Sequence, residues 1–391
     1  MTASARAVQA ATGRERLGLT DSAISAISAG SRSAAGEAGF PTVFGRELIG
    51  ELPSFVHRPY LIVTMADLWP RFDHHFDAHL AGLHFVETLD AAGVEAAAEA
   101  LPAFASVIGL GGGQASDVAK YFAWHRRRPL FQAPTAMTTN APFSHRAVLR
   151  DAGTAVSVGW AVPEAVYVDF DVIRAAPPLL NRSGVGDVLC YHTAHFDWKL
   201  AHDTGREERR WPYDERMVSE ARDRLDTVLA DLDEIHDVSD RGVRTLMLAH
   251  RWGGAAFHAA GWNTRHMDGV DHAFLYALEH QTGRQFIHGQ AVGLGTYVGA
   301  VLQDNEPEMI LSALHRVGVD IRPEAIGIDW DDAATAMRRL AWYVRYADLP
   351  YTIADARPVD DEIVEHVRDR IQATFGAWEQ AGHEGPRGGL I

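Results

Sequence analysis

The sequence contains one cysteine, Cys190, among 391 residues. A single cysteine excludes a disulfide framework within the chain and a zinc site built from several thiolates. Any metal ion must therefore be held by histidine, aspartate or glutamate. The low thiol content also suits a reducing compartment, and we expect a cytoplasmic protein.

Lysine is scarce as well. Lys120 and Lys199 are the only lysines, and the remaining basic residues are arginines, a bias that extends over the whole chain and that we attribute to codon usage. In total, 36 basic side chains stand against 52 acidic ones, for a formal net charge of −16 at pH 7. Because this excess of negative charge opposes binding to phosphate backbones and anionic membrane surfaces, we expect no nucleic-acid partner.

Long hydrophobic runs are missing. No stretch of the sequence approaches the roughly 20 uninterrupted apolar residues that a membrane-spanning helix needs, so we expect no membrane partner. The first 40 residues are rich in Ala, Ser and Gly but lack a continuous apolar segment, and Glu15, Asp21 and Glu37 argue against a transit peptide. We predict an N-terminal extension at 1–40, partly helical and partly disordered.

The next part of the chain alternates two kinds of segment. Short runs rich in β-forming residues lie at 60–64, 105–110, 129–135 and 165–173, and segments of helical character separate them. Strands that alternate with helix-length segments indicate a parallel sheet with crossover helices. The sequence therefore predicts an α/β, Rossmann-like nucleotide-binding domain over residues 41–176.

The pattern changes at Pro177 and Pro178. Beyond this pair the β-rich runs stop and amphipathic helical patterns follow, for example at 214–235 and 360–380. We predict an all-α domain over residues 177–391, in which the charged segment 205–216 is an exposed loop between helices.

Three consecutive glycines, Gly111, Gly112 and Gly113, stand between the β-rich run at 105–110 and a helical segment. This arrangement puts free backbone N–H groups and the positive end of a helix dipole at the edge of a sheet, where a diphosphate can bind. Glycine is needed there because a Cβ would hold the phosphate oxygens away from the amides. A tight turn without a ligand would need glycine too, and the pattern is not the GxGxxG fingerprint, so both interpretations stay open at this point.

Several ordered motifs extend the glycine pattern: GGGQASDVAK (111–120), APTAMTTNAPFS (133–144), VYVDFDVIRAAPPLL (166–180) and SGVGDVLCYHTAHFDWKLA (183–201). Together they resemble the iron-containing alcohol dehydrogenase superfamily. GVGD and DWKLA, with GVDHAFLYALEH (269–280) and IHGQAVGLGT (287–296), are similar to its glycerol-1-phosphate dehydrogenase branch, and the resemblance covers roughly residues 41–355. It implies a dehydroquinate synthase-like fold, in which the helical domain binds a metal ion.

The resemblance implies three metal ligands: Asp187 in a Gly-Val-Gly-Asp turn, His272 in Gly-Val-Asp-His, and His288 before a glycine. One carboxylate and two imidazoles from separate helices leave an open position, as a catalytic zinc or ferrous ion requires. Taken singly, Asp187 has the alternative of capping a helix that begins at its turn, and the two histidines have the alternative of being polar core or surface residues. The joint placement of the three favours the metal.

The resemblance also implies a cofactor, NAD or NADP. Gly111 to Gly113 would hold its pyrophosphate, and Asp117 would cap or brace the helix behind them. The nicotinamide half would contact Thr135, Thr138 and Ser144, although the two threonines have the alternative of satisfying loop backbone groups. Asp67, near the end of the run at 60–64, would bind the ribose hydroxyls and repel a 2′-phosphate, which favours NAD.

The reaction implied is the reduction of a small carbonyl compound to an alcohol, or the reverse, with a polyol phosphate such as dihydroxyacetone phosphate or glycerol 1-phosphate as substrate. Two catalytic positions depart from the family pattern. Asn140 stands where relatives carry Asp beside the substrate hydroxyls, and Tyr276 stands where the branch often has a second histidine. Both changes bear on the identity of the substrate. Candidates for proton delivery are His192, Tyr276 and His280, and candidates for binding a phosphate group are Arg146, Arg182, Arg265 and Arg284.

Other histidines are also considered as site residues. His74, His75, His79 and His84 are spaced like the faces of a mobile surface helix, and we interpret them as solvated. His192 and His195 follow Asp187 on the same predicted helix, so either is a candidate for lining the active-site cleft. Asp197 and Trp198 match a family motif that we assign to packing between helices.

Two other classes of function compete with the dehydrogenase. An NAD-using cyclase or lyase of the dehydroquinate synthase type shares the layout, but its active site depends on several lysines and this chain has two. A cofactor-binding protein without chemistry would be free to lose the metal ligands, which are all kept. The resemblance also implies a homo-oligomer.

Overall fold

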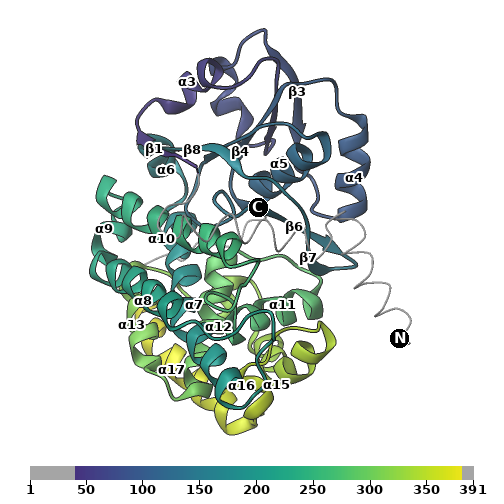
Figure 1. Ribbon diagram of the computed structural model, residues 1–391. Coiled ribbons are helices and arrows are strands. Elements are labelled where there is room, and N and C mark those ends of the chain that lie inside the picture. The colour runs from purple at the N-terminus through teal and green to yellow at the C-terminus, as the bar shows by residue number, and fades with distance from the viewer. Residues whose placement is uncertain (1–39, 381–391) are drawn as a thin grey trace. The chain divides into compact units, whose positions relative to one another are not determined.

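The structure, a computed structural model, describes residues 40–380 (Figure 1). The N-terminal extension predicted at 1–40 therefore lies, except for Phe40, outside the described residues. The chain forms two compact units whose main division falls between Ala175 and Ala176, beside the proline pair. Two short segments depart from a simple division: 251–263 belong to the first unit and 137–139 to the second.

The first unit contains a six-stranded sheet in the order β1-β8-β5-β4-β2-β3. Its strands are β1 (Thr42–Gly45), β2 (Tyr60–Thr64), β3 (Leu80–Phe85), β4 (Ser106–Gly111), β5 (Leu130–Pro134) and β8 (Pro163–Asp169). Every pair of neighbours is parallel, which confirms the predicted α/β class. The helices of this unit are α3 (Leu48–Phe55), α4 (Ala91–Ala100), α5 (Gly113–Arg126) and α6 (Phe170–Ala175).

Both faces of this sheet are buried. Leu61 and Val107 pack on one face in a cluster with side chains of α4 and α5, whereas Ile62 and Ile108 pack on the other face in a cluster with α3. Successive strand residues point to opposite faces, so a strand that is buried on both sides must be apolar throughout. This is why the central strands appear in the sequence as continuous apolar runs.

Two parts of the first unit differ from the sequence prediction. The segment with His74, His75, His79 and His84 is not a surface helix: His74 and His75 lie in a 3₁₀ turn, η2 (Asp73–His75), and His84 lies in strand β3 with its ring 4.8 Å from that of Phe122. The sequence also gave no indication of the antiparallel hairpin of β6 (Arg146–Asp151) and β7 (Thr154–Trp160).

The second unit is built from helices, and within 40–380 it contains no strand, as predicted. Its long helix α7 (Pro178–Asp203) packs against α8 (Glu215–Ala230), α11 (Val270–Thr282) and α12 (His288–Gln303) (Figure 1). The other helices are α9 (Leu232–His236), α10 (Asp240–Ala259, whose last turns belong to the first unit), α13 (Pro307–Val317), α14 (Pro323–Ile326), α15 (Trp330–Tyr346), α16 (Ile353–Ala356) and α17 (Asp361–Gln380). The charged segment predicted as a loop at 205–216 connects α7 to α8, and its last two residues already belong to α8. None of the helices described here has the length and apolar character of a membrane span.

Candidate active site

Asp187, His272 and His288 meet in the second unit. Each comes from a different helix: Asp187 from the interior of α7, His272 from the first turn of α11, and His288 from the first position of α12. One ligand atom from each residue lies within 4.8 Å of the others. Asp187 Oδ1 is 3.1 Å from His288 Nε2 and 3.6 Å from His272 Nε2. The three side chains therefore face one point.

Asp187 is not a helix cap. The N-cap of α7 is Pro177, and the helix continues without interruption through the Gly-Val-Gly-Asp segment. The interpretation of this segment as a turn that opens a helix is therefore wrong. Its two glycines serve a different purpose: Gly184 leaves room for the backbone carbonyl of Met137, and Gly186 lets a second helix approach.

Glycines allow α7 and α12 to touch through their backbones. A Cβ on Gly186 would lie 1.9 Å from the carbonyl oxygen of Gly289, and a Cβ on Gly289 would lie 2.0 Å from that of Ser183. Non-bonded atoms cannot approach so closely, so any side chain at either position would push the helices apart. Because Gly186 precedes Asp187 and Gly289 follows His288, this contact sets the distance between the two proposed ligands.

The electrostatics of this cluster suit a cation. Burial alone would raise the pKa of Asp187, but the surrounding His288, His272 and His250 side chains outweigh burial and hold this pKa well below its usual value. Burial lowers the pKa of His272, yet Asp268, Asp187 and Asp271 raise it well above its ordinary range. Carboxylates and imidazoles that converge in a buried site are the donor set of zinc or ferrous iron, so the residues present fit such an ion.

Two residues beside the cluster were not singled out from the sequence. Asp271 Oδ1 lies 2.7 Å from His272 Nδ1, on the side of the ring that faces away from Asp187 Oδ1. His250 is buried with Nε2 at 3.1 Å from the carbonyl oxygen of Met137 and Nδ1 at 3.6 Å from Asp187 Oδ2. The position of Asp271 directly before His272 was a usable signal, whereas His250 in α10 carried none.

Cys190 also lies close to His272 and Asp271. Its thiol donates to the backbone carbonyl oxygens of Asp187 and Met267, at 2.9 and 2.8 Å. Burial raises the pKa of this thiol well above its usual value. Both contacts direct the thiol hydrogen toward backbone oxygens, so we base the proposed donor set on Asp187, His272 and His288.

The three glycines join β4 to α5 in the first unit. Gly112 is the N-cap of α5, with a φ of −79° that any residue can adopt, and a Cβ there would meet no atom within 4 Å. Neither backbone conformation nor internal packing therefore requires glycine at this position. Open space above the N-terminus of a helix is what a pyrophosphate needs in order to reach the backbone amides, so this loop fits the phosphate bridge of a dinucleotide.

Behind this loop, Lys120 joins two of the predicted cofactor residues. Its fully buried ammonium lies 2.6 Å from Asp117 Oδ1 and donates to Ser144 Oγ at 2.9 Å and to the backbone carbonyl oxygens of Ala141 and Arg146. Asp117 thereby pairs with an ammonium three residues further along the same helix, α5. Lys120 also ties α5 to the chain at 141–146, and sequence analysis missed this role.

The other predicted cofactor and substrate positions are distributed over both units. Thr135 is buried next to the glycine loop, where its N–H donates to the carbonyl oxygen of Gly111 at 3.1 Å. Asp67 is exposed in the turn after β2. Asn140 lies in a turn of the first unit, whereas Thr138 belongs to the short segment counted with the second unit.

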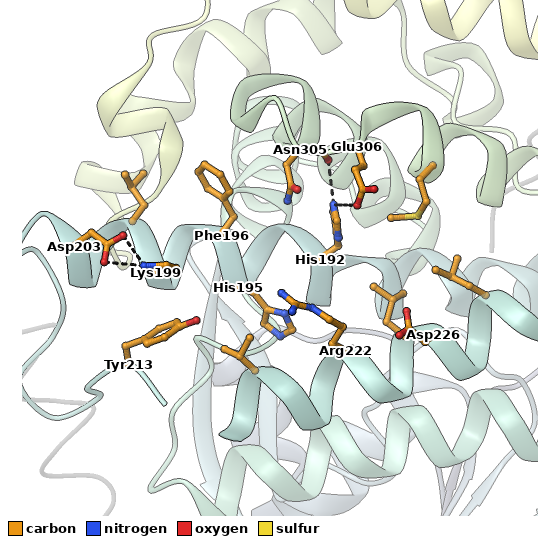
Figure 2. Close-up of a pocket in the computed structure, with 15 residues that line it drawn as sticks. His192, His195, Phe196, Lys199, Asp203, Tyr213, Arg222, Asp226, Asn305 and Glu306 are labelled. Carbon is orange, nitrogen blue, oxygen red and sulfur yellow. Dashed lines mark hydrogen bonds and ion pairs between the residues drawn. The ribbon is translucent and has the colours of Figure 1, made fainter. Parts of the chain in front are cut away.

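His192 and His195 lie away from the metal cluster. They line a separate cavity of about 630 Å³ between α7, α8 and the segment 305–309 (Figure 2). Figure 2 shows His192 turned toward this segment, and its Nε2 lies 3.0 Å from the carbonyl oxygen of Asn305. The structure therefore does not bring His192 together with Asp187, His272 and His288.

Tyr276 is nearer to the cluster, with its ring 6.1 Å from that of His272. His280 lies instead in an aromatic group, with its ring 5.0 Å from that of Tyr346. The arginines considered for a phosphate group donate to backbone carbonyls: Arg146 to Ser157, Arg182 to His236, Arg265 to Tyr351 and Asp197, and Arg284 to Gly327. Of the three candidates for proton delivery, the geometry favours Tyr276.

Asp197 and Trp198 lie between helices, as expected. Trp198 is fully buried, and the carboxylate of Asp197 accepts the N–H groups of Val270 and Ile353 at 2.7 and 2.8 Å. Asp197 thereby fixes the N-terminus of α11, which carries His272.

Comparison with known proteins identifies the family of this chain. Residues 72–177 match a family described as iron-containing alcohol dehydrogenase. A glycerol-1-phosphate dehydrogenase (NAD(P)+) of Thermofilum pendens is 32% identical over 285 residues, which cover 71% of this chain and 81% of the relative. A protein of the same name from Aeropyrum pernix is 32% identical and covers 69% of this chain and 75% of the relative.

Solved structures share the fold at lower identity. The crystal structure of glycerol dehydrogenase from Schizosaccharomyces pombe superposes with a TM-score of 0.65 at 18% identity and covers 89% of this chain and 94% of its own. A probable glycerol dehydrogenase from Sinorhizobium meliloti gives a TM-score of 0.64 at 22% identity, with 87% of this chain and 98% of its own covered.

Proposed function

Because the chain belongs to the iron-containing alcohol dehydrogenase family, which includes the glycerol-1-phosphate dehydrogenases, we propose that it is a metal-dependent, NAD(P)-linked oxidoreductase. It would reduce a small carbonyl compound to an alcohol, or catalyse the reverse. The observation that carries this proposal is the convergence of Asp187, His272 and His288 on one point of the buried face between α7, α11 and α12. A cofactor-binding protein that had lost its catalytic activity would be free to lose these three residues.

The residues of this chain would supply binding and orientation. Asp187, His272 and His288 would hold zinc or ferrous iron, and the glycine loop at 111–113 would hold the pyrophosphate of the dinucleotide. When bound, the ion supplies a Lewis acid for a carbonyl oxygen and the reduced nicotinamide supplies hydride; Lewis-acid stabilisation of this kind contributes several kcal/mol. Tyr276 is placed near His272, where its hydroxyl is the candidate for delivering a proton to the product.

The substrate class follows from the relatives. Proteins at about 30% identity over most of the chain are named for glycerol 1-phosphate, so we propose a polyol phosphate, with dihydroxyacetone phosphate as its carbonyl form. At Asn140 and Tyr276 this chain departs from the residues that its family usually carries. An amide at position 140 removes a negative charge, and this change would admit a more anionic substrate or one with a different arrangement of hydroxyls.

The positions of the two lysines disfavour the cyclase alternative. Lys199 is twelve residues beyond Asp187 on the same helix, a separation of about 18 Å along the axis, and it pairs with Asp203 at 2.7 Å. The Lys120 ammonium is buried in its contacts with Asp117, Ser144 and two backbone carbonyls. Neither ammonium is available for the lysine-dependent chemistry of that class.

A substrate screen tests the proposal. The purified chain, stripped with a chelator and reloaded with zinc or iron, is assayed for oxidation of NADH and NADPH with dihydroxyacetone phosphate, dihydroxyacetone and a panel of carbonyl compounds. We expect metal-dependent turnover, with the phosphorylated ketone as the better substrate and NADH as the better cofactor because of Asp67. Conversion of a seven-carbon sugar phosphate without net NADH change would favour the cyclase. Stoichiometric cofactor binding without metal or turnover would favour a non-catalytic relative.

We also propose a homo-oligomer in the cytoplasm, as the family resemblance and the single cysteine suggest. Light scattering during size-exclusion chromatography measures the mass directly. A mass near 42.8 kDa, that of one chain, would contradict the first part of this proposal.

A further inference from the structure

Asp271 is fully buried and uses both oxygens of its carboxylate. Oδ1 lies 2.7 Å from His272 Nδ1, and Oδ2 accepts the hydroxyl of Thr193 at 2.7 Å. Oδ1 also accepts the backbone N–H groups of His272 and Gly269, at 2.7 and 3.2 Å. One carboxylate thus fixes the backbone and the ring of the same histidine.

The contact between Asp271 and His272 decides which ring nitrogen carries the proton. A carboxylate oxygen can only accept, so Nδ1 of His272 must be the donor in this bond. In the neutral ring the lone pair then resides on Nε2, the nitrogen that faces Asp187 Oδ1 at 3.6 Å. Nε2 is the nitrogen that must be free of a proton in order to bind a metal ion.

Thr193 connects the Asp271–His272 pair to α7, the helix that carries Asp187. It lies on α7, six residues after Asp187, and its side chain is fully buried. Its hydroxyl is 3.2 Å from the carbonyl oxygen of Cys190 and 2.7 Å from Asp271 Oδ2. Since Asp187 and Thr193 belong to one rigid helix, the bond from Thr193 fixes Asp271, and through it His272, relative to Asp187.

The two histidines of the cluster differ in how firmly they are held. The His272 side chain is 7% exposed and is fixed by Asp271, whereas the His288 side chain is 31% exposed. A buried, oriented imidazole loses little freedom when it binds an ion, so its orientation contributes more to affinity than that of an exposed ring.

We propose that Asp271 and Thr193 are positioning residues of the metal centre: Asp271 orients His272 and sets its tautomer, and Thr193 holds Asp271 in place from α7. The inference rests on the proposed function only in assuming that the cluster binds a divalent metal. Loss of partners of this kind usually lowers metal affinity by about 10-fold to 100-fold.

Zinc binding to the full chain tests this role apart from catalysis. Asp271→Asn keeps the size of the side chain but removes its charge and one acceptor, and Thr193→Val keeps the shape but removes the hydroxyl. Zinc affinity is measured by competition with a chromophoric chelator, and cobalt substitution reports the ligand geometry through its visible spectrum. We expect Asp271→Asn to weaken zinc binding by about 10-fold or more and Thr193→Val by several-fold, with altered cobalt spectra. Thr193→Ser, which restores the hydroxyl, should restore both.

The chain contains a matched control. Thr245 donates its hydroxyl to Asp231 Oδ2, also at 2.7 Å, and Asp231 is a buried aspartate outside the metal cluster. Thr245→Val should lower the unfolding temperature about as much as Thr193→Val and leave the affinity for zinc unchanged. Equal loss of zinc affinity in both valine variants would mean a general loss of structure and would overturn the inference.

The test also separates this inference from the proposed function. Zinc binding that needs Asp187 and His288 but is unchanged in Asp271→Asn and Thr193→Val overturns the inference and leaves the function intact. Weaker zinc binding in both variants, in a chain that oxidises neither NADH nor NADPH with any carbonyl compound, supports the inference and overturns the function.

Discussion

His288 Nε2 lies 3.1 Å from Asp187 Oδ1, although the two residues are 101 positions apart in the chain and belong to different helices. The contact exists because α7 and α12 touch through Gly186 and Gly289, next to these two side chains. Metal binding and the packing of two helices are therefore linked, and each can be tested by its own substitution.

The first prediction concerns metal removal. The chelated wild-type chain should unfold at a lower temperature than the zinc-loaded chain. At free zinc of about 100 times the dissociation constant, linkage gives about 2.7 kcal/mol, or roughly 5–10 °C for a unit of this size. His288→Gln should lose most of this zinc-dependent shift, since it removes one of the three ligands. Differential scanning calorimetry with and without zinc measures the shift, and a full shift in His288→Gln would show that the ion binds elsewhere.

The second prediction concerns the contact between the helices. Gly289→Ala would put a methyl group 2.0 Å from the carbonyl oxygen of Ser183, so α7 and α12 must separate. We expect a loss of about 3 kcal/mol or more in the free energy of unfolding, together with weaker zinc binding.

Gly376→Ala is the control for this change. Gly376 lies within α17, and a Cβ there meets no atom within 4 Å, so alanine should stabilise the helix by about 0.5–1 kcal/mol. Urea unfolding of both variants measures the difference. If Gly289→Ala were as stable as the wild type, the backbone contact described above could not exist.

The sequence predicted the fold correctly where one physical signal, the burial of apolar residues, dominates the pattern. Continuous apolar runs and their alternation with helical segments predicted the parallel sheet, because a strand buried on both faces must be apolar. Strand β3 has no such signal, because every residue of Leu80–Phe85 is only partly buried. Its histidine, His84, was also grouped with the histidines of the predicted surface helix. The β6–β7 hairpin was missed for the same reason, since most of its residues are only partly buried.

The local sequence pattern did not predict correctly that Asp187 lies inside a helix. Gly-Val-Gly-Asp is typical of a turn with a cap. Only the tertiary contacts, of Gly184 with the backbone of Met137 and of Gly186 with α12, show why glycines stand inside a helix. The histidines could not be ranked by spacing either. His192 follows Asp187 by five residues, which turns it to another face of α7 and into a separate cavity.

The third prediction concerns the glycine loop. Gly112→Ala adds a methyl group to open space at the N-terminus of α5, so the unfolding temperature should change by no more than about 1–2 °C. The same methyl group would meet the pyrophosphate, and we expect the affinity for NADH to fall by about 10-fold or more, which corresponds to about 1.4 kcal/mol. Isothermal titration calorimetry with NADH measures this. Unchanged affinity in the variant would place the dinucleotide away from Gly112.

The last prediction concerns acid stability and His195. Burial, together with His266, Arg222 and His192 nearby, lowers the pKa of His195 to about 3. In the unfolded chain this histidine takes up a proton near pH 6.5, so between about pH 6.5 and about pH 3 the unfolded state binds more protons than the folded state. The stability contributed by this group is therefore present above pH 6.5 and is lost as the pH falls.

His195→Asn should reduce this acid sensitivity in the metal-free protein. Between pH 7 and pH 5 the wild type should lose about 2 kcal/mol more than the variant, since each pH unit below 6.5 corresponds to about 1.4 kcal/mol. The asparagine variant will be less stable at pH 7 because it packs less well, so the slope of stability against pH is the quantity to compare. His366→Asn, at an exposed position on α17, controls for the loss of a histidine. Parallel slopes for the wild type and His195→Asn would mean that the imidazole is already protonated, or free to protonate, in the folded chain.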